Sequence, residues 1–264
     1  YEPGANLEQQ TRLAKQSDVA IVVVGYTKEE EGEFIGDSED TVDMVKQIPR
    51  QDDPVLASEY EKYMRENHHY APDELRIKSR NGTFSIGGDR ESIRLLDADV
   101  QMIRAVAKVQ PRTIVVIVAG SAVVMSEWIN EVPAVVMGWY SGINGGRALA
   151  NILSGAVNPS GRLPFVIPHD ESHLPFFDRN AKKITYDYWH GQWKLDRDGN
   201  KPMFPFGFGC SYTQFSISSP TIETNEFIKF QCEVSNTGSR DGATVVQVYA
   251  GRKDSLIERP KRRL

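Results

Sequence analysis

An uninterrupted apolar run that stops at a cluster of carboxylates is the feature that most constrains this chain. Residues 18–25 read Asp-Val-Ala-Ile-Val-Val-Val-Gly, a pattern typical of a strand buried inside a parallel sheet. A group of glutamates follows this run almost at once: Glu29, Glu30, Glu31 and Glu33. Ligands of open α/β sheets bind beyond the carboxyl ends of the strands. The glutamates therefore stand where such a fold carries its chemistry.

The close spacing of these glutamates suggests that one of them could act as a general acid. Four like charges this close together cannot all ionise at low cost, so at least one pKa in the cluster should rise. A carboxyl group with a raised pKa is suited to act as a general acid near neutral pH. A solvated acidic loop without a catalytic role is the alternative interpretation of this segment taken alone.

Composition and charge exclude several classes of partner. The chain has 264 residues, of which 40% are hydrophobic and 25% charged, as expected for one or two ordinary globular domains. The net charge is −5, and the only basic run is residues 261–263. Binding to nucleic acid is therefore disfavoured, as is binding to an anionic membrane surface. No apolar stretch in the sequence reaches transmembrane length.

The sequence predicts neither a metal nor a cofactor. Cys210 and Cys232 give no disulfide framework and no metal-ligand spacing, so we expect both to pack as small apolar side chains. His169 and His173 have the spacing of a zinc site, but prolines flank them too closely for a helix. The glycines of residues 142–146 lack the spacing of a dinucleotide fingerprint, and no phosphate-binding loop is present.

Helical and strand-like segments alternate along most of the chain. The pattern predicts an α/β fold with a mostly parallel sheet and helices on both faces, an α/β sandwich. Helices are expected at 5–16, 97–109 and 145–153, and Asp97 could cap the second of them. Buried strands are expected at 18–25, 113–120 and 132–139. An edge-like strand is expected at 163–168.

Two further segments depart from this alternation. Residues 38–85 form a long polar insertion with an amphipathic helix expected near 56–66, which is either a functional lid or a surface insertion. We assign residues 1–213, with this insertion, to the α/β domain. Residues 214–264 predict the start of an all-β, immunoglobulin-like sandwich, incomplete because such a sandwich needs roughly seven strands. Its strands are expected at 217–223, 227–235 and 243–250.

The order of the motifs resembles the C-terminal half of glycoside hydrolase family 3, the β-glucosidase and β-xylosidase family. The last segment also resembles the fibronectin type III-like domain of that family. The matching segments are residues 18–25, Glu31–Glu33, Gly88–Arg90, Trp139–Gly142 with Gly145–Gly146, Asn158–Pro164, Phe204–Gly209, Ser211–Thr213, Asn236–Gly238, Arg240–Gly242 and Val246–Tyr249.

The resemblance implies a reaction and its residues. An N-terminal (β/α)8 barrel would carry the sugar pocket and an aspartate nucleophile, and this chain would lend the acid/base glutamate, Glu31 or else Glu33. The reaction would be retaining hydrolysis of an oligosaccharide or an aryl or alkyl β-glycoside. Arg90 would support the loop or contact substrate. Trp139 and Tyr140 could stack on a sugar or simply pack.

The departures from the family pattern leave alternatives open. The barrel and its nucleophile are missing from this sequence, and residues 38–85 separate the Glu-Gly pair from the Asp-Arg pair. A non-catalytic carbohydrate-binding or interaction module of the same fold is the second hypothesis, and an unrelated nucleotide-binding α/β protein is the third. The sugar, the linkage and the compartment (periplasmic, secreted or cytoplasmic) stay open. A homodimer is expected if barrel-facing surface is exposed.

Overall fold

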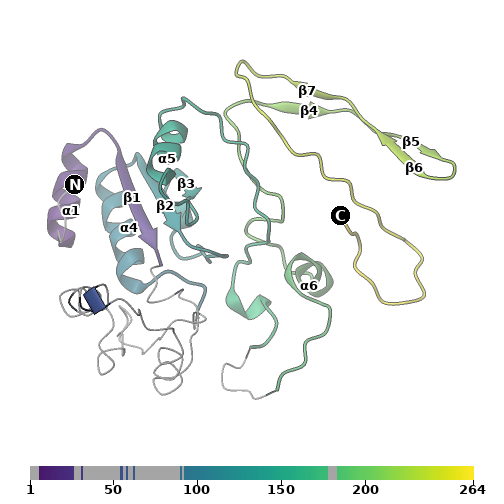
Figure 1. Ribbon diagram of the computed structural model, residues 1–264, viewed down its shortest axis with the longest axis horizontal. Coiled ribbons are helices and arrows are strands. Elements are labelled where there is room, and N and C mark those ends of the chain that lie inside the picture. Colours follow the sequence, from purple (N-terminus) through teal and green to yellow (C-terminus); the bar gives the residue numbers. More distant parts are fainter. Residues whose placement is uncertain are drawn as a thin grey trace. The chain divides into compact units, whose positions relative to one another are not determined.

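The computed structural model describes residues 6–26, 31, 54–55, 58, 62, 90, 92–177 and 183–264. The chain forms two compact units (Figure 1). Unit 1 consists of Tyr1–Val123 and Glu127–Trp139, and unit 2 consists of Val124–Ser126 and Tyr140–Leu264. Most of the insertion expected at 38–85, with the helix expected near 56–66, lies outside the described residues.

The centre of unit 1 is a parallel sheet in the order β1-β2-β3. Strand β1 (Ala20–Gly25) pairs with β2 (Thr113–Val118), and β2 pairs with β3 (Ala134–Met137). Both pairings are parallel, and the last residues of β1 and β2, Gly25 and Val118, stand opposite each other. The three strands expected from the apolar runs are therefore confirmed, each shorter than its run. Full burial is wrong for two of them, because two positions of β1 are exposed and β3 contains no buried residue.

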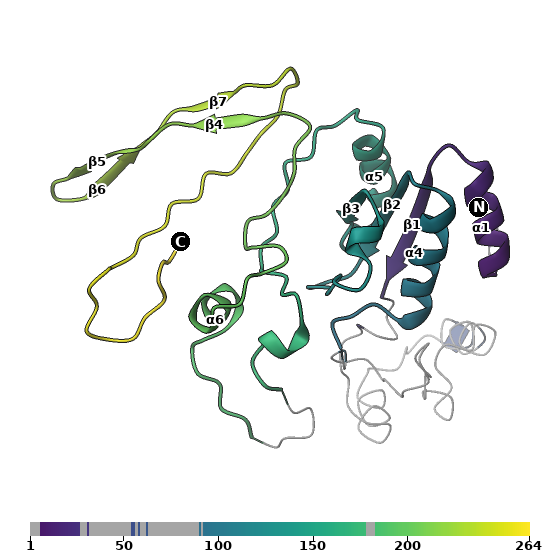
Figure 2. The same cartoon turned by 180° about the vertical axis from the view of Figure 1, so that it is seen from behind.

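Helices α1 (Leu7–Gln16) and α4 (Asp97–Val109) pack against each other in unit 1, as Figure 2 shows from behind. Helix α4 also contacts β1 and β2. The bounds of α4 agree with the prediction, but the capping role expected for Asp97 is wrong. Leu96 is the N-cap residue and makes no side-chain cap bond, so Asp97 acts only as an acidic residue in the first turn.

The core of unit 1 lies between α4 and the sheet. Its apolar side chains come from alternate positions of β1, from most of β2, and from the inner face of α4, as expected for a strand covered on one or both faces. The buried residues are Val22, Val24, Val100, Ile103, Val106, Val115, Val116 and Ile117. A short 3-10 helix, Ile129–Glu131, precedes β3.

The described part of unit 2 contains the α-helices α5 (Gly145–Leu153) and α6 (Gly191–Asp198). Helix α5 has the predicted bounds and ends before Gly155, whose φ of 75° closes the helix. Helix α6 was not predicted; it ends at Gly199 with φ of 74°. A 3-10 helix spans Glu171–His173.

The edge-like strand expected at 163–168 is wrong. This segment forms no strand; it makes an isolated bridge between Ile167 and Phe204 and backbone hydrogen bonds from Leu163 to Phe208 and from Gly207 to Leu163. Its two prolines, Pro164 and Pro168, have no N–H to donate, and so a ladder cannot extend past Ile167.

The last part of unit 2 is a ribbon of short antiparallel pairs (Figures 1 and 2). The pairs are β4 (Phe215–Ile217) with β7 (Val234–Asn236), and β5 (Thr221–Thr224) with β6 (Ile228–Gln231). The expected strand 217–223 is divided between β4 and β5, and 227–235 between β6 and β7. The strand expected at 243–250 is wrong, because only Ala250 forms a bridge there, with Arg263.

Gly25 generates a stability prediction because β1 approaches β2 there without room for a side chain. Its φ is 137°, and a Cβ at this position would stand 1.9 Å from the Val118 carbonyl oxygen. We expect Gly25→Ala to lower the free energy of unfolding by about 3 kcal/mol, through backbone strain and this clash. Urea unfolding followed by circular dichroism measures the change.

Gly146 of α5 is the matched control, since an added Cβ there would meet nothing within 4 Å. Gly146→Ala should stabilise the protein by roughly 0.5–1 kcal/mol, because alanine is the better helix former. Equal effects of the two substitutions would contradict the role given to Gly25.

Candidate active site

The candidate site lies where β1 and β2 end. Because the two strands are parallel and in register up to Gly25 and Val118, the segments that leave them start at the same edge of the sheet. The backbone N–H of Tyr26 donates to the Val118 carbonyl oxygen at 2.9 Å. This bond carries the strand pairing one residue further, to Tyr26.

Glu31 is bound at this edge through both of its carboxylate oxygens. Oε1 lies 2.8 Å from Nε of Arg90, and Oε2 accepts the backbone N–H of Gly120 at 2.8 Å. The Glu31 side chain is only 12% exposed. Glu31 therefore ties the segment after β1 to Arg90 and to the segment after β2.

Arg90 is the other half of this ion pair, and its side chain is 7% exposed. Its guanidinium lies over the ring of Tyr26, 4.2 Å from the ring centroid, within the range of a cation–π contact. Nη2 donates to the Ser121 hydroxyl and, at 3.1 Å, to the carbonyl oxygen of Ala122. The buried Nη1 has no hydrogen-bond partner among the residues that the structure describes.

The aromatic ring of Tyr26 packs against the guanidinium of the ion pair. The residue is 5% exposed, and its hydroxyl donates to the Arg94 carbonyl oxygen. Burial raises the pKa of the Tyr26 hydroxyl, and the neighbouring positive charge of Arg90 opposes that rise. Tyr26 therefore stays neutral across the physiological range and acts as a hydrogen-bond donor and ring platform.

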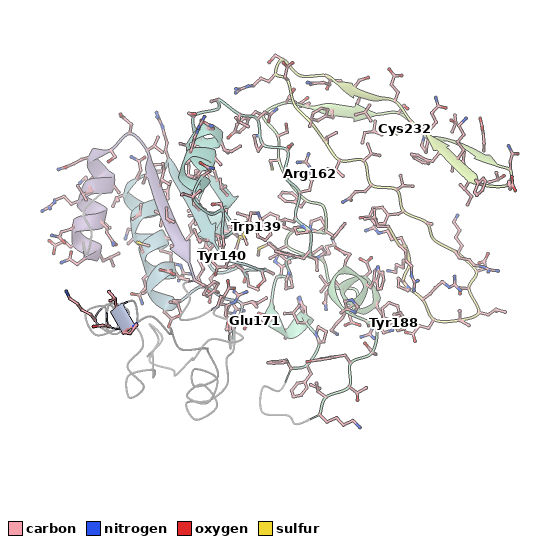
Figure 3. The ribbon with its side chains drawn as sticks, in the orientation of Figure 1. Trp139, Tyr140, Arg162, Glu171, Tyr188 and Cys232 are labelled. Carbon is pink, nitrogen blue, oxygen red and sulfur yellow. The ribbon has the colours of Figure 1, made fainter. Side chains whose placement is uncertain are left out.

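The structure brings together two of the residues expected at the site, Glu31 and Arg90. Glu33 lies outside the described residues. Trp139 and Tyr140 follow β3, whose carboxyl end lies at the same edge of the sheet as that of β2 (Figure 3). Trp139 has φ of 55°, which is uncommon for a bulky residue and typical of a functional constraint. Tyr140 is 52% exposed.

Three residues of this cluster were missed by the sequence analysis: Tyr26, Gly120 and Ser121. Gly120 takes part through its backbone N–H, which leaves no side-chain signal in a sequence. Tyr26 and Ser121 could have been found by one rule, since each lies within three residues of the carboxyl end of a predicted strand.

The cysteines and histidines form no comparable site. Both cysteines are free; Cys210 is exposed, so the expectation that it packs as an apolar side chain is wrong, and Cys232 is partly buried. His173 belongs to the 3-10 helix Glu171–His173. Within the described ranges, no group of three or more histidine, cysteine or acidic residues could hold a metal ion. No helix in the described part of the chain has the length and apolar character needed to cross a bilayer.

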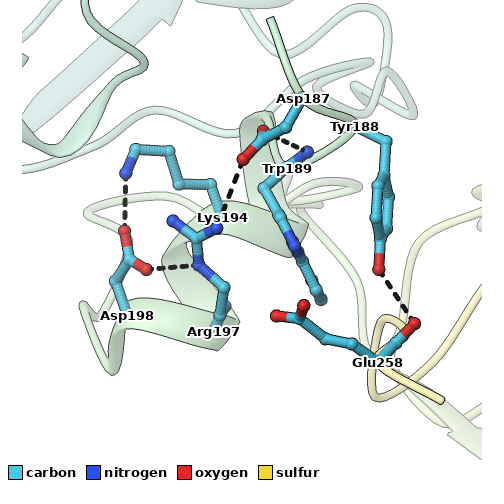
Figure 4. Close-up of polar contacts among 7 residues, drawn as sticks. All are labelled: Asp187, Tyr188, Trp189, Lys194, Arg197, Asp198 and Glu258. Carbon is cyan, nitrogen blue, oxygen red and sulfur yellow. Dashed lines mark hydrogen bonds and ion pairs between the residues drawn. The ribbon is translucent and has the colours of Figure 1, made fainter.

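A second polar cluster surrounds α6 in unit 2 (Figure 4). Asp198 lies 2.6 Å from Nε of Arg197 and 2.6 Å from Nζ of Lys194. Hydrogen bonds from Arg197 and then Lys194 lower the pKa of Asp198 to about 2. The Tyr188 hydroxyl donates to the Glu258 carbonyl oxygen at 3.0 Å. A carboxyl ionised this strongly cannot serve as a general acid near neutral pH, so we give Asp198 no catalytic role.

Comparison with known proteins agrees with this geometry. Residues 4–212 match the family described as Glycosyl hydrolase family 3 C-terminal domain. This match covers most of the chain, and the chain therefore belongs to glycoside hydrolase family 3, to its C-terminal domain.

Relatives in the family are named as glycosidases. Beta-glucosidase BoGH3A of Bacteroides ovatus is 38% identical over 192 residues, which are 67% of this chain and 26% of that protein. Thermostable beta-glucosidase B of Acetivibrio thermocellus is 35% identical over 190 residues, 68% of this chain and 25% of that protein. A beta-xylosidase of Formosa agariphila is 32% identical over 187 residues, 66% of this chain and 24% of that protein. The chain thus spans about a quarter of the length of these relatives.

Solved structures share the fold. Beta-glucosidase from Kluyveromyces marxianus in complex with glucose has a TM-score of 0.72 at 25% identity, over 97% of this chain and 25% of that one. DesR, a beta-glucosidase from Streptomyces venezuelae in complex with D-glucose, has a TM-score of 0.69 at 26% identity, over 97% of this chain and 27% of that one. The fold class predicted from the sequence, an α/β sandwich, is confirmed.

Burial of the Glu31–Arg90 pair generates a prediction about stability. Arg90→Met leaves the Glu31 carboxylate covered without its cation, and we expect a loss of about 3–5 kcal/mol of unfolding free energy. The control is Arg104→Met, which removes an Arg–Glu pair of similar length, 3.0 Å to Glu131, whose side chains are 50% and 43% exposed. That loss should be within about 1 kcal/mol. Denaturant titration of both variants measures the difference, and similar losses would contradict the burial argument.

Proposed function

We propose that this chain is the C-terminal part of a retaining β-glycosidase that hydrolyses terminal β-glycosidic bonds, and that it supplies the acid/base glutamate. The observation that carries the proposal is the position of Glu31, which is held beyond the carboxyl end of β1 in a family 3 C-terminal domain. The β-glucosidases and the β-xylosidase among its relatives support a β-glycoside as substrate.

The chemistry needs two carboxyl groups. An aspartate on an N-terminal (β/α)8 barrel, which we propose for the complete enzyme, would attack the anomeric carbon and form a glycosyl-enzyme. A glutamate of the segment after β1, Glu31 or Glu33, would protonate the leaving oxygen and then deprotonate the attacking water. This reaction requires neither a metal nor an organic cofactor.

The other predicted site residues have supporting roles in this proposal. Trp139 and Tyr140 would contribute aromatic contacts to the sugar at the same edge of the sheet. Arg90 would hold the glutamate segment through its ion pair with Glu31. Residues 1–213 would form the α/β domain with its insertion at 38–85, and residues 214–264 the start of a fibronectin type III-like domain.

The proposal predicts that the chain by itself does not hydrolyse glycosides. One carboxylate of a two-carboxylate mechanism would be absent, so nitrophenol release from aryl β-glucosides should equal that of buffer. The same chain expressed as one polypeptide with the barrel from its own coding region should accelerate hydrolysis by more than about 10⁶-fold over the uncatalysed reaction.

Two results would contradict this function. Turnover by the chain alone that survives repurification would show that the barrel carboxylate is not needed. If the chain expressed as one polypeptide with the barrel binds cellobiose in calorimetry but releases no product, the result would instead support the hypothesis of a non-catalytic carbohydrate-binding module.

We also propose that the isolated chain self-associates through its C-terminal ribbon. Every side chain of β5 and β6 is exposed, including large apolar ones such as Ile222, at 61%, and Ile228, at 79%, with Phe227 between the strands at 80%. An exposed apolar ribbon with open edges favours pairing with a second copy.

Light scattering tests this self-association. The wild-type chain should show a dimer at high concentration, and Phe227→Asp with Ile228→Asp should shift it to the monomer, because charges on the ribbon oppose its burial. Thr224→Asp, which adds a charge to β5 without removing apolar surface, is the control and should shift it far less. A wild-type chain that stays monomeric throughout would refute the proposal.

A further inference from the structure

We infer that residues 258–263 form a releasable strap that fastens the C-terminal end of the chain to α6, and that the strap and the helix open together while unit 1 stays folded. Both segments belong to unit 2. Nothing in this coupling depends on the proposed enzymatic function.

Two arginines of the strap reach aromatic and acidic side chains. The guanidinium of Arg263 lies 5.2 Å from the ring centroid of Trp193 in α6, within the range of a cation–π contact. The guanidinium of Arg262 lies 5.2 Å from the ring centroid of Tyr249, and its Nε lies 3.9 Å from a carboxylate oxygen of Asp196. Arg263 therefore connects the strap to α6 through a ring, and Arg262 connects it through a charge.

Backbone contacts fix the two ends of the strap. At one end, the Tyr188 hydroxyl donates to the Glu258 carbonyl oxygen at 3.0 Å (Figure 4). At the other end, Arg263 and Ala250 exchange two backbone hydrogen bonds, each 2.8 Å long. Pro260, between these ends, is buried. The strap thus has a defined course over unit 2.

The sequence of α6 explains why this helix needs the strap. The helix has eight residues, and a helix this short is not stable without tertiary contacts. Asp196 and Asp198 stand in its last turn, where the helix dipole disfavours negative charge. Lys194 and Arg197 offset the charge of Asp198 from within the helix. Arg262 brings a positive charge to Asp196 from the strap.

The exposure of these contacts explains why the strap can be released locally. The Arg262 side chain is 56% exposed, and salt screens charge interactions at such positions. The inner side of α6 is held differently, by the buried side chain of Leu195. Because the core of unit 1 takes no part in these contacts, strap and helix should open as one local unit at a lower free energy than global unfolding.

Hydrogen exchange of backbone amides in the whole chain tests the coupling. The reporter is the Gly199 amide, which donates to the Leu195 carbonyl oxygen at the end of α6. We expect Arg262→Gln combined with Arg263→Gln to accelerate its exchange about 5- to 30-fold, since two stabilising contacts are lost. Lys261→Gln, which removes an exposed charge of the same strap, is the matched control and should change the exchange by less than about twofold.

The effect should also run from the helix to the strap, because coupling between two elements is reciprocal. Trp193→Leu removes the ring that receives Arg263. The Arg263 amide, which donates to the Ala250 carbonyl oxygen, should then exchange roughly threefold to tenfold faster.

A salt series on the wild-type chain adds a test without substitutions. Raising sodium chloride from about 0.05 to 1 M should accelerate exchange at Gly199 about threefold relative to Tyr26. The Tyr26 amide, bonded to the Val118 carbonyl oxygen in unit 1, is the internal reference.

Three results would overturn the strap. Unchanged Gly199 exchange in the double variant would show that α6 does not depend on the two arginines. Equal acceleration in Lys261→Gln would reduce the effect to net charge. Acceleration at Tyr26 as large as at Gly199 would show global opening. If the double variant does not fold, the salt series decides, and a constant ratio of Gly199 to Tyr26 exchange would refute the coupling.

Discussion

The parallel pairing of β1 with β2 is the constraint on which the rest of unit 1 depends. Its register ends with Gly25 opposite Val118, and the absence of a side chain at Gly25 lets the two backbones approach there. Because both strands end at one edge, a single arginine can stack on Tyr26 after β1 and donate to residues after β2. A slip of one residue would move Tyr26 to the other face and separate these groups.

Much of the fold follows from local patterns. Helices 97–109 and 145–153 were predicted to the residue, since apolar periodicity and the Pro and Gly signals agree at these positions. Helix α6 was missed because its sequence, Gly-Gln-Trp-Lys-Leu-Asp-Arg-Asp, buries only Leu195 and so carries almost no periodic signal. The strands expected at 163–168 and 243–250 failed because strand formation depends on a partner, which the sequence pattern does not specify.

Two residues of the site, Glu31 and Arg90, could be predicted from the sequence, but the contacts between them could not. Glu31 and Arg90 were singled out separately, one from the carboxylate cluster and one from the family motif, while their ion pair joins segments far apart in the sequence. The acceptor role of Glu31 toward Gly120 could not be predicted, since a backbone N–H has no residue type. The resemblance supplied the expected chemistry, and the structure adds the contacts that hold its first candidate, Glu31.

A buried ion pair is a poor way to gain stability, because removing two charges from water costs about as much as their attraction returns. Its presence beside the candidate site is better explained by geometry. An acid/base group lent from one domain to a substrate in another must be placed to within about 0.5 Å, and a surface loop alone cannot hold that position. Two directional bonds, one from Arg90 and one from the Gly120 N–H, fix the position of Glu31. The cost in desolvation is then the physical condition for a fixed position of Glu31 at the ends of β1 and β2.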